Sequence, residues 1–126
     1  MYSKFQNKFL TADNKKRAFI NAQKIKTLWF NTGTLCNLAC KGCYIDSSPK
    51  NDRLAYLSFN EFKSFVNESI QNKMGTEQIG FTGGEPFMNR DIFKMIKYSL
   101  ENGFKTLVLT NAMKPMLNNK NELFKI

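Results

Sequence analysis

The feature that most limits the fold of this chain is an alternation of short apolar runs with amphipathic segments. The apolar runs cover residues 27–30, 79–82 and 106–109, and each is short enough to be one buried strand. The segments between them have the hydrophobic period of helices. Strand, helix, strand, helix, strand at this spacing predicts right-handed βαβ units and a parallel α/β sheet. Nearly continuous apolar strands also predict a sheet that is buried on both faces.

Both intervening segments carry helix signals at their ends. Ser58 followed by Glu61 is a capping-box pattern, and Gly75 is expected to end the helix that follows. The second helix is expected over about 90–102, with Gly103 as its stop. Another amphipathic helix is expected to begin in 119–126. The residues expected to face inward are Phe59, Phe62, Phe65, Val66 and Ile70 in the first helix and Ile92, Met95, Ile96 and Leu100 in the second.

The long loop after the first predicted strand contains all three cysteines of the chain, Cys36, Cys40 and Cys43. Three soft thiolates this close in sequence can bind one inorganic centre. A cubane [4Fe–4S] cluster has four corners, so three cysteines leave one iron open to an outside ligand. Such a centre could take part in chemistry as well as carry electrons.

Other uses of the three cysteines are less consistent with the sequence. A closed zinc site takes four ligands, and this chain has no histidine, so a carboxylate such as Asp46 or a partner chain would have to supply the fourth. Any disulfide would leave one thiol unpaired. Three unrelated buried cysteines remain the simplest alternative, but chance rarely places the only three in one loop.

Two more turn-forming segments follow the second and third predicted strands. Gly83, Gly84 and Glu85 follow the second, and Thr110 and Asn111 follow the third. The carboxyl ends of parallel strands meet at one edge of a sheet, where active sites form. Paired glycines let a ligand approach the backbone closely. Each segment alone could be an ordinary turn, but beside the cysteine loop they predict one site.

The three segments together resemble the radical S-adenosylmethionine (radical SAM) superfamily. The resemblance runs from about residue 27 to 113 and rests on CNLACKGC, FTGGEP and LVLTNA in this order. It implies a parallel-sheet, partial (β/α) barrel of the TIM-barrel-like type, with about three βα units in this chain. Residues 27–126 are then expected to be the N-terminal half of a radical SAM core domain, and 1–26 a basic N-terminal arm.

The resemblance also implies the cofactors and the reaction. The three cysteines are expected to hold a [4Fe–4S] cluster whose open iron binds the amino and carboxylate groups of S-adenosylmethionine. One electron from the reduced cluster then cleaves the cofactor into methionine and a 5′-deoxyadenosyl radical, which abstracts a substrate hydrogen. No catalytic residue beyond the cluster ligands is expected. The expected metal ligands are Cys36, Cys40 and Cys43.

Further cofactor contacts follow from the same resemblance. Gly83, Gly84 and Glu85 are expected to receive the methionine amino group, so a Cβ at Gly84 is expected to weaken cofactor binding but not cluster assembly. Asn111 and Tyr44 are further candidates for contact with the cofactor.

Two positions in these segments depart from the family pattern. The residue before the last cysteine is often aromatic in the family and is Gly42 in this chain. The residue after the strand-end asparagine is often glycine and is Ala112 in this chain.

The expected partners are a substrate that the sequence does not identify and an external electron donor of the flavodoxin or ferredoxin kind. A C-terminal half or self-association could complete the barrel. Within the same family, an activating enzyme for a glycyl-radical protein is an alternative. From other classes, the alternatives are an iron–sulfur electron carrier and a zinc-binding nucleic-acid module.

Charge and hydropathy bear on partners and compartment. The net charge is +9, and residues 1–26 contain seven Lys and Arg against one Asp. We interpret this arm as a solvated basic segment, because no RNA-binding signature accompanies it, and nucleic acid is not expected as a partner. No apolar run of membrane-spanning length occurs, and the N-terminus lacks an apolar leader pattern. With thiols that must stay reduced, this favours the cytoplasm.

Overall fold

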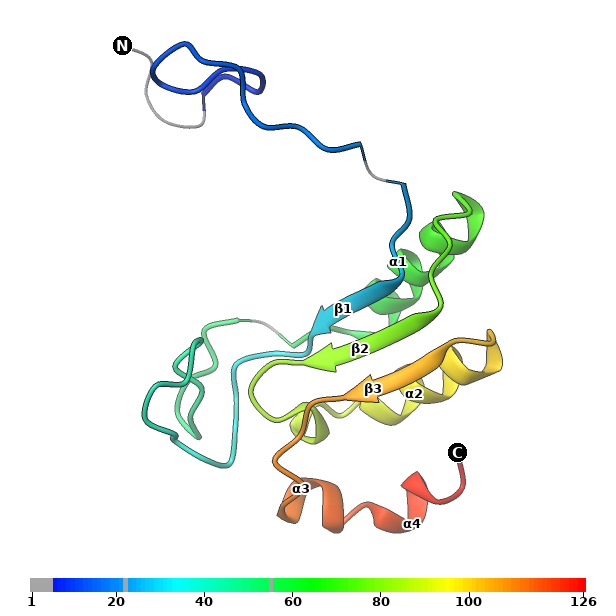
Figure 1. Ribbon diagram of the computed structural model, residues 1–126. Helices are drawn as coiled ribbons and strands as arrows, with labels where there is room; N and C mark the ends of the chain where they lie inside the picture. The colour runs from blue at the N-terminus through cyan, green and yellow to red at the C-terminus, as the bar shows by residue number, and fades with distance from the viewer. Residues whose placement is uncertain (1–5, 22, 55) are drawn as a thin grey trace.

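A parallel sheet of three strands lies at the centre of the computed structural model, which describes residues 6–21, 23–54 and 56–126 (Figure 1). The strands are β1 (Thr27–Asn31), β2 (Gln78–Thr82) and β3 (Lys105–Val108), in the order β1-β2-β3. Both pairs are parallel, as the alternating pattern predicted. An open sheet of three strands with helices is consistent with part of a βα barrel.

Two longer helices connect the strands, α1 (Phe59–Gln71) and α2 (Ile92–Glu101). A 3₁₀ turn, η1 (Pro86–Met88), lies between β2 and α2. Two single-turn helices follow β3, namely α3 (Lys114–Leu117) and α4 (Lys120–Leu123). The helix predicted to begin in 119–126 is α4, whose N-cap is Asn119, and α3 is an additional helix that the sequence pattern did not predict.

Helix α1 begins as the capping-box pattern predicted but ends earlier. The Ser58 hydroxyl accepts from the Glu61 backbone N–H, and the Glu61 carboxylate accepts from the Ser58 backbone N–H at 2.9 Å. The helix ends at Gln71, and Lys73 already has a positive φ of 49°. Gly75 does not end the helix as predicted, since it lies in the turn before β2, where its own φ is 70°.

Helix α2 ends at the predicted glycine. Gly103 has a φ of 80°, and its N–H donates to the Leu100 carbonyl at 2.9 Å. The next N–H, of Phe104, donates to the Ser99 carbonyl at 3.0 Å. These two bonds form a Schellman motif, which satisfies the last carbonyls of the helix and turns the chain directly into β3.

The hydrophobic core lies between the sheet and the two helices. The rings of Phe30 and Phe62 meet edge to face with centroids 4.7 Å apart, and Phe81 packs beside them. On α1 the fully packed stripe is Phe62, Val66 and Ser69. On α2 the predicted residues Ile92, Met95 and Ile96 are buried as expected. Three other residues predicted to face inward are substantially exposed: Phe65 (54%), Ile70 (44%) and Leu100 (40%).

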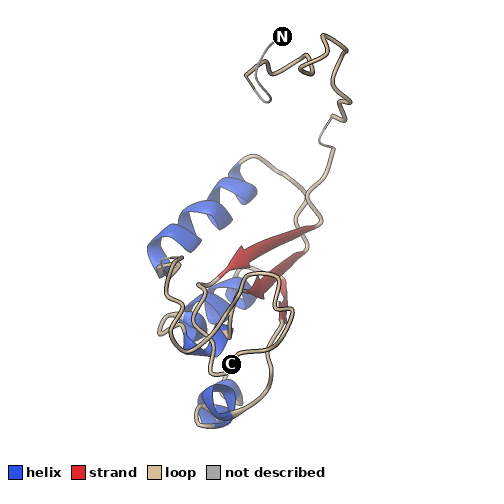
Figure 2. Cartoon of the chain, turned by 90° about the vertical axis from the view of Figure 1, so that its left-hand side faces the viewer, coloured by secondary structure: helices blue, strands red, loops and turns tan. Residues whose placement is uncertain are grey.

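The opposite face of the sheet is not covered by a helix in the described part of the chain (Figure 2). Trp29 is 47% exposed, and Leu107 and Leu109 are 39% and 51% exposed. Trp29 and Leu107 flank Gly80 in the sheet register, and a Cβ on Gly80 would lie only 2.4 Å from the indole. The prediction of burial on both faces is therefore wrong for this chain, because α1 and α2 both pack on the same side.

The basic segment before β1 extends away from the sheet in Figure 1. Its described part contains an antiparallel bridge between Leu10 and Lys16. Within the described ranges, no helix is long and apolar enough to span a membrane.

Candidate functional site

The loops that follow the three strands meet at the carboxyl edge of the sheet, where all three arrowheads point in Figure 1. The loops after β1 and β2 run side by side. The N–H of Gly84 donates to the Gly33 carbonyl at 2.8 Å, and the N–H of Glu85 donates to the Leu35 carbonyl at 3.0 Å. The segment that leads into the cysteines is thus attached directly to the segment after β2.

The glycine pair after β2 is required by this close approach. Gly83 has a φ of 135°, and a Cβ there would lie 2.6 Å from the Gly33 carbonyl oxygen. A Cβ on Gly84 would lie 2.1 Å from the Leu35 carbonyl oxygen. The backbone of the cysteine loop therefore occupies the space on the Cβ side of Gly84. That a ligand contacts this segment stays a prediction.

Glu85 joins the loop after β2 to the loop after β3. Its side chain is buried, with the residue 2% exposed. One carboxylate oxygen accepts from the Phe87 N–H at 3.1 Å and from the Thr110 hydroxyl at 2.8 Å. The other accepts from the Asn111 N–H at 2.9 Å. Three donors therefore fix the carboxylate inside the protein.

Asn111 extends this connection to the cysteine loop. Its side-chain Nδ2 lies 2.9 Å from Asn37 Oδ1 and 3.7 Å from the sulfur of Cys36. The structure therefore brings Cys36, Glu85 and Asn111, which are far apart in sequence, into one hydrogen-bonded network. Each of the three comes from a different strand-end loop.

The three cysteines differ in their surroundings, and all are free thiols. Cys36 is buried, Cys40 is exposed and Cys43 is intermediate. In the part of the chain that the structure describes, no three Cys, Asp or Glu side chains form a group that could hold a metal ion. The structure thus places Cys36 in the network and leaves Cys40 and Cys43 apart from it in the loop.

The donor chemistry of the loop nevertheless suits an iron–sulfur cluster. The backbone N–H groups of Ile45 and Ser47 lower the pKa of Cys43, and the Ser47 bond is 3.4 Å long. Cys36 likewise accepts from the Leu38 N–H at 3.4 Å. The thiolate is the form of cysteine that binds metals, so the bonds to Cys43 favour its ligating state. A Cβ added to Gly42, the residue before Cys43, would meet no atom within 4 Å beyond its chain neighbours.

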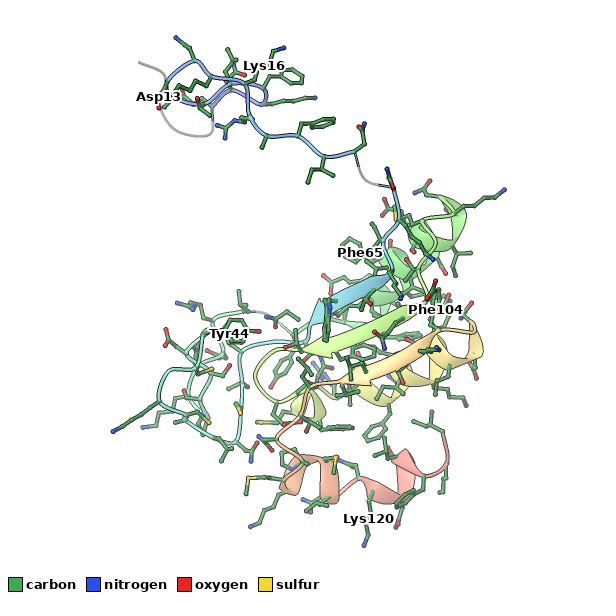
Figure 3. The ribbon with its side chains drawn as sticks, in the orientation of Figure 1. Asp13, Lys16, Tyr44, Phe65, Phe104 and Lys120 are labelled. Atoms are coloured by element: carbon green, nitrogen blue, oxygen red, sulfur yellow. The ribbon has the colours of Figure 1, made fainter. Side chains whose placement is uncertain are left out.

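Tyr44 projects from the cysteine loop toward the end of β2, on the uncovered face of the sheet (Figure 3). Its hydroxyl lies 3.5 Å from the Thr82 hydroxyl, and its side chain is mostly exposed. Thr82 shares a face with Gly80 and Trp29, because alternate residues of a strand face the same way. Tyr44 therefore stands at the rim of the open face, beside the strand ends.

One supporting residue, Asn89, was not singled out in the sequence. It is 2% exposed, and its Nδ2 donates to the carbonyls of Thr32 at 3.0 Å and Leu57 at 2.9 Å. Its Oδ1 accepts from the Asp91 N–H at 2.8 Å. Asn89 thereby holds both ends of the cysteine loop. A turn asparagine that bridges distant backbone groups has no local sequence signal.

Comparison with known proteins gives the same family as the motifs. The family model described as "Radical SAM superfamily" matches residues 30–125. A protein from Selenomonas ruminantium named "S-adenosylmethionine-dependent nucleotide dehydratase" is 33% identical over 85 residues, which are 68% of this chain and 29% of that protein.

Other similar proteins carry different names. The "Antilisterial bacteriocin subtilosin biosynthesis protein AlbA" of Bacillus subtilis is 36% identical over 77 residues, or 61% of this chain and 16% of that protein. A "GTP 3′,8-cyclase" of Pasteurella multocida is 32% identical over 78 residues, or 60% of this chain and 23% of that protein. The chain spans less than a third of the length of each of these relatives.

Proposed function

Because the chain belongs to the radical SAM superfamily, we propose that its strand-end site binds a [4Fe–4S] cluster together with S-adenosylmethionine. The observation that carries this proposal is the network of Cys36, Glu85 and Asn111. It joins a candidate cluster ligand to the segments proposed to hold the cofactor. A site built from successive strand ends is the usual arrangement in βα folds.

The cluster ligands in this proposal are Cys36, Cys40 and Cys43. Three thiolates leave one iron open, which S-adenosylmethionine would occupy. A reduced cluster held by these cysteines would supply one electron for cleavage of the cofactor's carbon–sulfur bond, which would give a radical able to abstract a substrate hydrogen. We expect the loop to close around the cluster, since Cys40 is exposed and the Cβ side of Gly42 is open.

The cofactor's amino group is assigned to the segment from Gly83 to Glu85. The Glu85 carboxylate already accepts from three donors, and a carboxylate has about four lone-pair sites. It can therefore take at most one more donor. The backbone carbonyls of Gly83 and Gly84 would supply the remaining acceptors. Tyr44 remains a candidate for contact with the cofactor from the uncovered face of the sheet.

The proposed reaction also requires an electron donor and a substrate. The electron would come from an external flavodoxin- or ferredoxin-like donor. The names of the relatives state different reactions or pathways, and the chain spans less than a third of each, so no substrate class is carried over.

The test is anaerobic reconstitution of the reduced chain with iron and sulfide, followed by EPR with and without S-adenosylmethionine in large excess. We expect about four irons and four sulfides per chain, and a reduced-cluster signal that changes when the cofactor is added. Single Cys→Ser variants at 36, 40 and 43 should each lose most of the iron, because a serine oxygen is a poor substitute for thiolate.

Three outcomes would contradict the proposal. A cluster whose EPR signal does not change when S-adenosylmethionine is added would indicate an electron carrier. Stoichiometric zinc without iron would indicate a zinc-binding module. Full iron content in all three serine variants would show that the ligand assignment is wrong.

A further inference from the structure

The orientation of the Asn111 side chain is fixed by an unambiguous donor. The backbone N–H of Met113 points at one end of the amide, at 3.0 Å, so that end must be the carbonyl oxygen. The NH₂ end therefore faces the cysteine loop. This assignment matters because oxygen and nitrogen of an amide are otherwise hard to tell apart.

The NH₂ end has two hydrogens and two acceptors in front of it. One acceptor is Asn37 Oδ1 at 2.9 Å, and the other is the Cys36 sulfur at 3.7 Å. An amide NH₂ can serve both, one hydrogen to each. Because Cys36 is buried, with 8% of the residue exposed, water competes little for its sulfur.

The backbone of Asn111 is held as firmly as its side chain. Its N–H donates to the buried Glu85 carboxylate at 2.9 Å. The neighbouring Thr110 hydroxyl donates to the same carboxylate at 2.8 Å and accepts from the Ala112 N–H at 3.0 Å. Glu85 therefore positions Asn111, and Asn111 in turn contacts Cys36.

We propose that Asn111 is a positioning residue for Cys36, and that its N–H···S hydrogen bond raises the reduction potential of a cluster bound there. This role rests on the proposed function. Asn111 would donate a hydrogen bond to the sulfur of the cluster ligand Cys36, and it would not contact S-adenosylmethionine directly. A hydrogen bond to a ligand sulfur stabilises the more negative, reduced state of a cluster. Glu85 contributes indirectly, because it holds the backbone of Asn111.

The contact itself is tested in the metal-free, reduced chain by NMR of the side-chain amide groups. Cys36→Ala should shift the Asn111 NH₂ resonances, because it removes an acceptor. Cys40→Ala is the matched control, since Cys40 is exposed, and it should leave them in place. Equal effects of the two variants, or no effect of Cys36→Ala, would overturn the inference.

The redox role is tested by EPR-monitored titration of the reconstituted cluster. Asn111→Asp keeps an acceptor for Met113 but loses the N–H donor, and Asn111→Ala loses the donor without adding charge. Both should shift the reduction potential to more negative values. Asn60→Asp, an exposed position on α1, adds the same charge at another element and should leave the potential nearly unchanged.

The outcomes separate this inference from the proposed function. A wild-type chain that takes up no iron would overturn the proposed function and the redox role with it, while the NMR comparison still decides the contact. A cluster whose potential is the same in wild type and Asn111→Ala would overturn the redox role alone. A shift of the reduction potential seen only with Asn111→Asp would be an effect of the added charge, and it would also overturn the redox role of Asn111.

Discussion

Ala112 has a left-handed backbone conformation, with a φ of 55°, at the position where the family often has glycine. This conformation costs a residue with a Cβ about 1–2 kcal/mol of folding free energy, a cost that glycine does not have. Glycine in turn loses roughly 0.5–1 kcal/mol more conformational entropy on folding than alanine. Ala112→Gly should therefore stabilise the chain by about 0.5–1 kcal/mol in urea unfolding. The control is Ala39→Gly, at a loop residue without a positive φ, which should not stabilise the chain. An Ala112→Gly variant that is less stable than the wild type would contradict the prediction.

Glu85 is the residue whose side chain holds the strand-end loops together. Because both carboxylate oxygens accept hydrogen bonds, Glu85→Gln would turn an NH₂ group toward a donor. The expected loss is about 1–3 kcal/mol of unfolding free energy, measured with urea. Glu68→Gln, on the exposed side of α1, should change stability by less than about 0.5 kcal/mol. Equal effects of the two substitutions would show that the Glu85 network is not stabilising.

At the scale of the elements, α1 depends on its capping box, and this dependence should vary with pH. The Ser58 hydroxyl and then its backbone N–H lower the pKa of Glu61 below its ordinary value of 4.5. The stabilisation is therefore complete above that value and is lost as the pH falls through the lowered pKa. Glu61→Gln should shift the unfolding midpoint more at about pH 7 than at about pH 3. An equal shift at both pH values would contradict the role of its charge.

The loops after β1 and β2 depend on each other through Gly84. Gly84→Ala would place a Cβ 2.1 Å from the Leu35 carbonyl oxygen, so the cysteine loop must move. We expect a loss of about 1–3 kcal/mol, and faster hydrogen exchange at the amides of Gly84 and Glu85. Gly42→Ala meets no atom within 4 Å and should leave those amides protected. Unchanged exchange in Gly84→Ala would show that the two loops are not coupled.

The elements were largely predictable because their signals are local. The Ser58 and Glu61 cap, the Gly103 stop and the apolar strands act within a few residues of their own positions. The uncovered sheet face was not predictable, because a short apolar strand can have the same sequence pattern whether one or both of its faces are packed. Nor were the contacts of Asn89 and Asn111, because they join segments dozens of residues apart.

At the scale of the whole molecule, the uncovered sheet face and the free edge of β3 are the main exposed apolar features. In the described part of the chain β3 pairs only with β2, and Leu107 and Leu109 remain exposed. The matched part of the chain covers less than a third of each relative named above. We therefore expect the isolated chain to take up a cluster but to bind S-adenosylmethionine weakly and without sustained turnover. We propose that further strands, from additional chain or from a second copy, would be needed for full activity.

The measurement for this expectation is 5′-deoxyadenosine production by the reduced chain, with its mass determined by light scattering. Less than one equivalent of product per monomer is expected. Sustained multiple turnover by a monomer would show that three βα units suffice.

The central claim is that the cysteine loop and the Gly83–Glu85 segment form one site for a cluster and its cofactor. It is tested most directly by ENDOR spectroscopy of the reduced, reconstituted chain with excess S-adenosylmethionine labelled with nitrogen-15 at its amino group. We expect a nitrogen-15 coupling to the cluster that is absent with unlabelled cofactor. A well-formed reduced cluster without this coupling would contradict it.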